Sequence, residues 1–76
     1  MAAKPRPGSF AAFLLAAHTG TSIEAEKVRA RGGGLALSAV DSVLRRLTVE
    51  GYLETASVTP KGLRYLQKHG WVDKPG

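Results

Sequence analysis

Two adjacent arginines, Arg45 and Arg46, are the residues of this chain whose type and position best indicate chemistry. A guanidinium group donates paired hydrogen bonds to carboxylate or phosphate groups and keeps its charge at physiological pH. Ser42 precedes the arginines at helical spacing, and Val49 follows them. Small, polar and cationic side chains in this order indicate a surface that is pressed against an anionic partner.

Other residue types that carry chemistry are sparse. His18 and His69 are far apart and have no second ligand in a metal-site pattern. The glycines at 32–34 lack the Lys-Ser or Lys-Thr that follows in a phosphate-binding loop. No nucleophile has a histidine and an acid at a recognisable spacing, and 76 residues leave little room for an enclosed pocket. We therefore expect no enzyme activity, no cofactor, no metal and no small-molecule substrate.

The composition favours a small basic domain with an anionic partner. Eleven Lys and Arg residues against six Asp and Glu give a net charge of +5, which favours nucleic acid or an acidic membrane surface. A chain of this length forms one domain with a small core. It contains no cysteine, which excludes disulfides and thiolate metal sites and agrees with a reducing compartment.

No segment is expected to span a membrane or to direct export. The longest apolar run, residues 10–17, is far shorter than the roughly 20 residues of a spanning helix. A basic start precedes this run, as in a signal peptide, but Pro5, Pro7 and Gly8 interrupt the pattern. We therefore expect a cytoplasmic protein without a membrane partner.

The two arginines lie on a segment whose apolar residues recur at three- and four-residue spacing, which predicts a helix. The predicted buried stripe consists of Val40, Val43, Leu44 and Leu47. Ser38, with Asp41 three positions later, predicts the N-cap, and Gly51 predicts the end. The residues opposite the stripe are Ser42, Arg45, Arg46 and Val49. The arginines are therefore expected to face away from the core.

Two helices are predicted before this one. Ser9 and Gly20 delimit the first, over residues 10–18. Its outer side is unusually apolar, and we expect the tail or another subunit to cover it: Ala11, Ala12, Leu15 and Ala16. Thr21 or Ser22 begins the second helix, which has acids in its first turn, bases in its last turn and three consecutive glycines after it.

A small hairpin and a last helix are predicted after the arginine-bearing helix. Residues 52–54 and 57–59 alternate between polar and apolar types, which predicts two short strands. Thr59 followed by Pro60 predicts the cap and first position of a helix that ends at Gly70. Residues 1–8 are predicted to form a flexible basic arm, residues 9–72 the domain and residues 73–76 a C-terminal tail.

Three segments of the chain carry a resemblance to a known family. They are residues 38–47 (SAVDSVLRRL), residues 50–53 (EGYL) and residues 59–62 (TPKG). Together with the predicted order of elements, they resemble the winged helix-turn-helix domain of small bacterial and archaeal repressors of the MarR and PadR kinds. The resemblance spans residues 10–70 and implies a mainly α fold with a small β-hairpin, in the order α-α-α-β-β-α.

This resemblance implies a transcriptional regulator, a repressor, that binds double-stranded DNA with its third helix in the major groove. The groove-facing residues that it implies are Ser38, Ala39, Ser42, Arg45, Arg46 and Val49. The phosphate contacts that it implies are Lys27, Arg29, Arg31, Lys61 and Arg64, with Lys4 and Arg6 on the arm. It also favours a homodimer on a palindromic site, with the outer side of the first helix and the Trp71 segment as candidate dimer surfaces.

Several of these residues also have ordinary structural explanations. Asp41 would repel DNA phosphates unless it caps the helix, and the predicted hairpin carries Glu54 but no cation. Arg45 and Arg46 are also explained as a solvated pair, with Glu50 as an ion-pair partner. A winged helix that contacts another protein instead of DNA would fit Asp41, the hairpin without cations and the apolar outer side of the first helix. Fold alone does not decide between the two functions.

Overall fold

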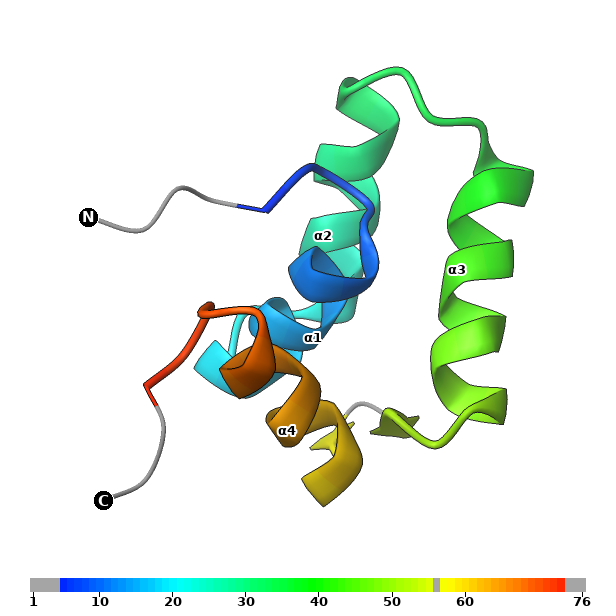
Figure 1. Ribbon diagram of the computed structural model, residues 1–76. Helices are drawn as coiled ribbons and strands as arrows, with labels where there is room; N and C mark the ends of the chain where they lie inside the picture. The colour runs from blue at the N-terminus through cyan, green and yellow to red at the C-terminus, as the bar shows by residue number, and fades with distance from the viewer. Residues whose placement is uncertain (1–4, 56, 74–76) are drawn as a thin grey trace.

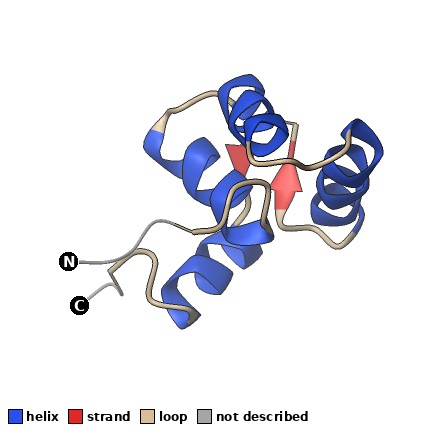
Figure 2. Ribbon diagram, turned by 90° about the horizontal axis from the view of Figure 1, so that it is seen from above, coloured by secondary structure: helices blue, strands red, loops and turns tan. Residues whose placement is uncertain are grey.

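The computed structural model describes residues 5–55 and 57–73, and this part of the chain forms four helices and one two-stranded sheet (Figure 1). In chain order they are α1 (Phe10–Thr19), α2 (Ile23–Gly32), α3 (Leu37–Val49), β1 (Leu53–Glu54), β2 (Ser57–Val58) and α4 (Pro60–Lys68). The strands are antiparallel, with Leu53 opposite Val58, and lie side by side among the helices (Figure 2). The predicted fold class, mainly α with a small β-hairpin, is confirmed. None of the described helices has the length and apolar character of a membrane span.

Short polar side chains begin three of these helices, as the sequence predicts. Ser9 caps α1, Ser22 caps α2 and Thr59 caps α4. Each side chain accepts a hydrogen bond from the backbone N–H three residues later, at 3.0–3.2 Å. Gly20 ends α1 with a φ of 85°, a left-handed conformation that glycine adopts without strain. These local signals mark the starts of α1, α2 and α4 and the end of α1.

The predicted N-cap of α3 is wrong. The helix begins at Leu37, its N-cap is Ala36, and no side chain caps it. The preceding turn decides this start, because the Leu35 N–H donates to the Ala30 carbonyl oxygen (3.2 Å) and the Leu35 side chain packs against the core. Ser38 consequently lies inside the first turn of α3 and is exposed, so its hydroxyl is left for other contacts.

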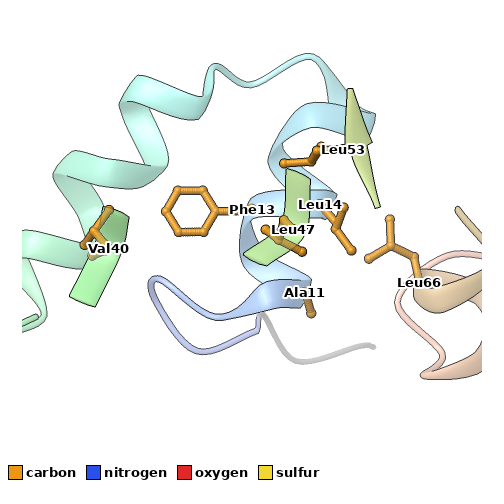
Figure 3. Packing of buried hydrophobic residues seen from close by; sticks show 8 residues of the cluster. Ala11, Phe13, Leu14, Val40, Leu47, Leu53 and Leu66 are labelled. Atoms are coloured by element: carbon orange, nitrogen blue, oxygen red, sulfur yellow. The ribbon is translucent and has the colours of Figure 1, made fainter. Parts of the chain in front are cut away.

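The central helix is α1, which contacts α2, α3, α4 and β2. Phe13 and Leu14 on α1 are fully buried, and Phe13 points toward Val40 of α3 (Figure 3). Leu47 of α3 and Leu66 of α4 complete the same cluster. Burial of one such side chain stabilises the fold by about 1.5–3 kcal/mol. The predicted apolar stripe of α3 is therefore confirmed as the side that faces the core.

The apolar outer side of α1 is largely covered by the chain itself. Ala11, Ala12 and Ala16 are buried, and Leu15 is half-buried. Pro5 and α2 lie against this side of α1, which explains the burial. Trp71, the other candidate dimer surface, is half-buried against the same core. Its backbone N–H donates to the Leu66 carbonyl oxygen (2.9 Å).

Candidate functional site

One side of α3 is turned away from the rest of the molecule. The helix stands at an edge of the fold, and its other side contacts α1, α2 and β1 (Figure 1). Val40 and Leu47 on that inner side are only 1% and 0% exposed. The outer face of α3, as we define it, consists of five exposed residues at helical spacing: Ser38, Asp41, Ser42, Arg45 and Val49. These residues extend over about 16 Å along the helix axis.

Arg45 occupies the middle of this outer face. It is exposed, and within the described residues it makes no hydrogen bond and no ion pair. Asp41, which lies one turn earlier, is also exposed and does not pair with it in the described part of the chain. An anionic partner therefore meets this guanidinium group without displacing an existing contact.

Arg46 lies on the flank of α3 beside α1. Its Nε atom donates to Glu50 Oε2 at 2.9 Å, and its guanidinium carbon lies 5.4 Å from the centroid of the Phe10 ring. The ion pair with Glu50 that the sequence suggests is thus confirmed. Its side chain is still 68% exposed, and exposed helix pairs contribute only about 0.3–0.5 kcal/mol, so Arg46 remains within reach of a partner. Ala39, the last predicted groove residue, is half-buried.

A cationic surface follows one side of α4. Lys61, Arg64 and Lys68 are exposed and recur at three- and four-residue spacing. The helix contains no acidic residue. We call these three residues the basic ridge of α4. Lys68 was not predicted as a site residue, although its spacing from Lys61 and Arg64 was a signal that the sequence contained.

Contacts at the junction between α3 and α4 fix the position of the outer face. Lys61 Nζ donates to the Glu50 carbonyl oxygen at 2.7 Å, where α3 ends. The Thr59 hydroxyl donates to the backbone, with the carbonyl oxygens of Gly51 and Tyr52 both within hydrogen-bond distance. The start of α4 is thereby attached to the end of α3, so the outer face of α3 and the basic ridge of α4 keep a fixed relation.

Two of the three predicted cations of α2 are paired with acids of the same helix. Lys27 Nζ lies 3.2 Å from Glu24 Oε1, and Arg29 Nε lies 3.0 Å from Glu26 Oε1. Arg31 is exposed and has no ion-pair partner among the described residues. Lys27 or Arg29 contacts a phosphate only after it leaves its carboxylate partner, whereas Arg31 needs no such exchange.

Sequence reasoning missed the buried carboxylate of Glu26, which is 6% exposed. Its Oε2 atom accepts a hydrogen bond from the Gly8 N–H at 3.0 Å. Arg29, its ion-pair partner, also donates through Nη2 to the Pro5 carbonyl oxygen at 3.1 Å. The signal in the sequence was weak: an acid that shares one helical face with Ile23 and Ala30. The Glu26–Arg29 pair holds the segment before α1 onto α2.

The described part of the predicted arm is consequently docked on the domain. Pro5 and Gly8 are buried and Arg6 is exposed, while Lys4 lies outside the described residues. The segment runs along the end of α2 and its connection to α3, where Pro7 lies beside Gly33 and Gly8 beside Leu35. The arm cation that the structure describes, Arg6, therefore belongs to a segment that is held against the domain.

The hairpin offers acid and hydroxyl groups rather than cations. Glu54 and Ser57 lie opposite each other and are exposed. Among its described residues, 53–55 and 57–58, there is no lysine or arginine. Thr55 has a φ of 60°, the left-handed conformation of a tight turn. This element therefore adds no positive charge beside the outer face of α3.

Comparisons with known proteins gave no match: no protein-family model, no curated protein and no solved structure matches this chain. Within residues 5–55 and 57–73, no three side chains of His, Cys, Asp or Glu gather as a metal site. The outer face of α3 and the basic ridge of α4 are the features that bear on function.

Proposed function

We propose that this protein is a winged helix-turn-helix domain that binds double-stranded DNA and represses transcription. In this proposal α3 lies in the major groove, α2 braces it across the DNA backbone, and β1 and β2 form the wing. The major groove is about 12 Å wide, which admits one α-helix with its side chains, about 10–12 Å in diameter. The observed order of helices and hairpin agrees with this arrangement.

The observation that carries the proposal is the uncovered outer face of α3. Arg45 has its donors available, and guanine O6 and N7 are the acceptors that arginine contacts most often in the groove. The hydroxyls of Ser38 and Ser42 are exposed on the same face, and a hydroxyl contacts bases or phosphates. The same face carries Asp41, which does not cap α3, so the DNA contacts in this proposal come from Arg45 and the two serines.

Phosphate contacts come from cations around that face. Arg46 on its flank, Arg31 at the end of α2 and the basic ridge of α4 are exposed. The net charge of +5 supports attraction to a polyanion over several ångströms. Lys27 and Arg29 contribute less in this proposal, because Glu24 and Glu26 already neutralise them.

A homodimer on a palindromic site completes the proposal. Two copies related by a twofold axis would read two half-sites one turn of DNA apart, about 34–36 Å. Such a protein acts on the nucleoid in the cytoplasm.

The test is DNA binding measured by fluorescence anisotropy over a series of salt concentrations. Affinity for a random duplex is expected to fall steeply, with a log–log slope of about −0.9 for each phosphate contacted. Selection from a random pool then gives a preferred site. Arg45→Ala is expected to weaken binding to that site by about 1–3 kcal/mol and to relax the preference at one base pair.

Arg64→Ala is the matched control, because it removes an exposed arginine from another helix. It is expected to weaken binding to all sequences alike and to leave the preferred site unchanged. If Arg45→Ala keeps the wild-type preference, the outer face of α3 is not the reading surface. If the wild-type protein binds no duplex at low salt, the proposed function is wrong.

A second candidate function is a module that contacts another protein. Leu37 and Val49 on α3 are 53% and 77% exposed, and the described hairpin residues include no cation. An apolar partner surface would cover both side chains. Absence of duplex binding at every salt concentration would favour this function over DNA binding.

A further inference from the structure

Val49 is the most exposed of the large apolar residues of α3. It lies four residues after Arg45 on the same outer face, and within the described residues it packs against no part of the core. Valine is a weak helix former because its branched side chain is restricted in a helix. Neither helix formation nor core packing therefore explains a valine at this position.

Thymine offers the one methyl group of the major groove, the C5 methyl, and apolar side chains contact it there. Val49 presents two methyl groups on the face whose centre holds Arg45, a side chain suited to guanine. The hydroxyl of the neighbouring Thr48 is already directed back to the Leu44 carbonyl oxygen (3.1 Å). Leu37, the other exposed apolar residue of α3, lies at the opposite end of the helix.

We propose that Val49 contacts the C5 methyl group of a thymine close to a guanine contacted by Arg45. This inference rests on the proposed function, since it assigns specificity within the same groove-binding face. Four residues of α-helix advance by about 6 Å, and successive base pairs rise by about 3.4 Å. The thymine is therefore expected within about two base pairs of the guanine.

The experiment starts from the site that the wild-type protein selects out of a random duplex pool. Each thymine of this site is replaced in turn by uracil, which removes the methyl group and keeps the base pairing. One replacement is expected to weaken wild-type binding about fourfold, the effect of one buried methyl group. Replacing a guanine within about two base pairs of it by 7-deazaguanine, which lacks N7, is expected to weaken binding as well.

Val49→Ala is expected to bind the thymine and uracil duplexes equally. Val28→Ala is the matched control, because Val28 is 73% exposed but lies on α2. That variant is expected to keep the full wild-type loss on uracil substitution. Both positions are exposed and alanine favours helices, so both variants are expected to fold, which circular dichroism verifies.

The outcomes separate this inference from the proposed function. Equal sensitivity to uracil in Val49→Ala and in wild type would overturn the methyl contact while DNA binding stands. Wild-type binding that is indifferent to uracil at every thymine would overturn it too. Failure of the wild-type protein to bind any duplex would overturn both the contact and the proposed function.

Discussion

At Gly62 the backbone of α4 passes so close to the chain after α3 that a side chain does not fit. A Cβ atom there would collide with the Tyr52 carbonyl oxygen and lie 2.9 Å from Val58 Cγ1. The Tyr52 carbonyl oxygen also accepts a hydrogen bond from the Thr59 backbone N–H at 3.1 Å, so this carbonyl group is not free to move away. A packing requirement thus explains the glycine of the TPKG segment.

Gly62→Ala is therefore expected to destabilise the protein by about 1–3 kcal/mol, the usual cost of overpacking. This loss should appear even though alanine favours an α-helix by about 1 kcal/mol over glycine. Gly32→Ala in α2 is the matched control, because a Cβ atom there meets nothing within 4 Å. Urea unfolding followed by circular dichroism measures both. A Gly62→Ala protein as stable as wild type would contradict the close approach.

The contact between α2 and the segment before α1 depends on one buried carboxylate, that of Glu26. Glu26→Gln keeps the size of the side chain but removes the charge that Arg29 and the Gly8 N–H now contact. Hydrogen bonds to charged groups contribute about 1.5–3 kcal/mol. Hydrogen exchange of the Gly8 amide is therefore expected to accelerate about tenfold or more, measured by NMR.

Glu24→Gln is the control for this prediction. Glu24 belongs to the same helix and pairs with Lys27, but its side chain is 79% exposed. Removing its charge is expected to leave exchange at Gly8 unchanged, because exposed pairs contribute little. Equal exchange rates at Gly8 in wild type and Glu26→Gln would show that the carboxylate does not hold the segment.

The elements show which parts of the fold the sequence was able to predict. The caps Ser9 and Thr59 act within one turn, so their residue types alone identified two helix starts. Ser38 has the same residue type, but the start of α3 depends on Leu35 and its packing on the core. Helical periodicity likewise identified the outward side of α3, because spacing determines the face that a residue occupies.

Pairing across the chain was beyond such reasoning. Gly8 and Glu26 are 18 residues apart, and their hydrogen bond exists because the fold brings α2 against the segment before α1. Whether a cation is bonded or free also depends on which elements the fold brings together. Lys61 and Arg64 are both exposed cations of α4, but Lys61 donates to the Glu50 carbonyl oxygen, and Arg64 makes no side-chain hydrogen bond among the described residues.

Over the whole molecule, positive charge is concentrated on surfaces rather than spread evenly. The basic ridge of α4 stands on a helix without any acid, whereas the outer face of α3 carries one base, Arg45, and one acid, Asp41. The cations of α2 are largely matched by Glu24 and Glu26. In the proposed DNA complex, the location of a charge is therefore expected to affect binding more than the net charge does.

Paired substitutions that remove the same charge from different surfaces test this statement. Arg64→Gln with Lys68→Gln removes two cations of the basic ridge, and Arg6→Gln with Lys27→Gln removes two from the arm and α2. If the ridge contacts two phosphates, its variant lowers the magnitude of the log–log salt slope by about 1.8 and keeps the preferred site. The arm and α2 variant is expected to keep nearly the wild-type slope, because Lys27 is already paired with Glu24 and Arg6 belongs to the segment that is docked on α2. Fluorescence anisotropy over a salt series measures both slopes. Equal losses in the two variants would mean that net charge alone attracts the DNA, and the basic ridge would then have no specific role.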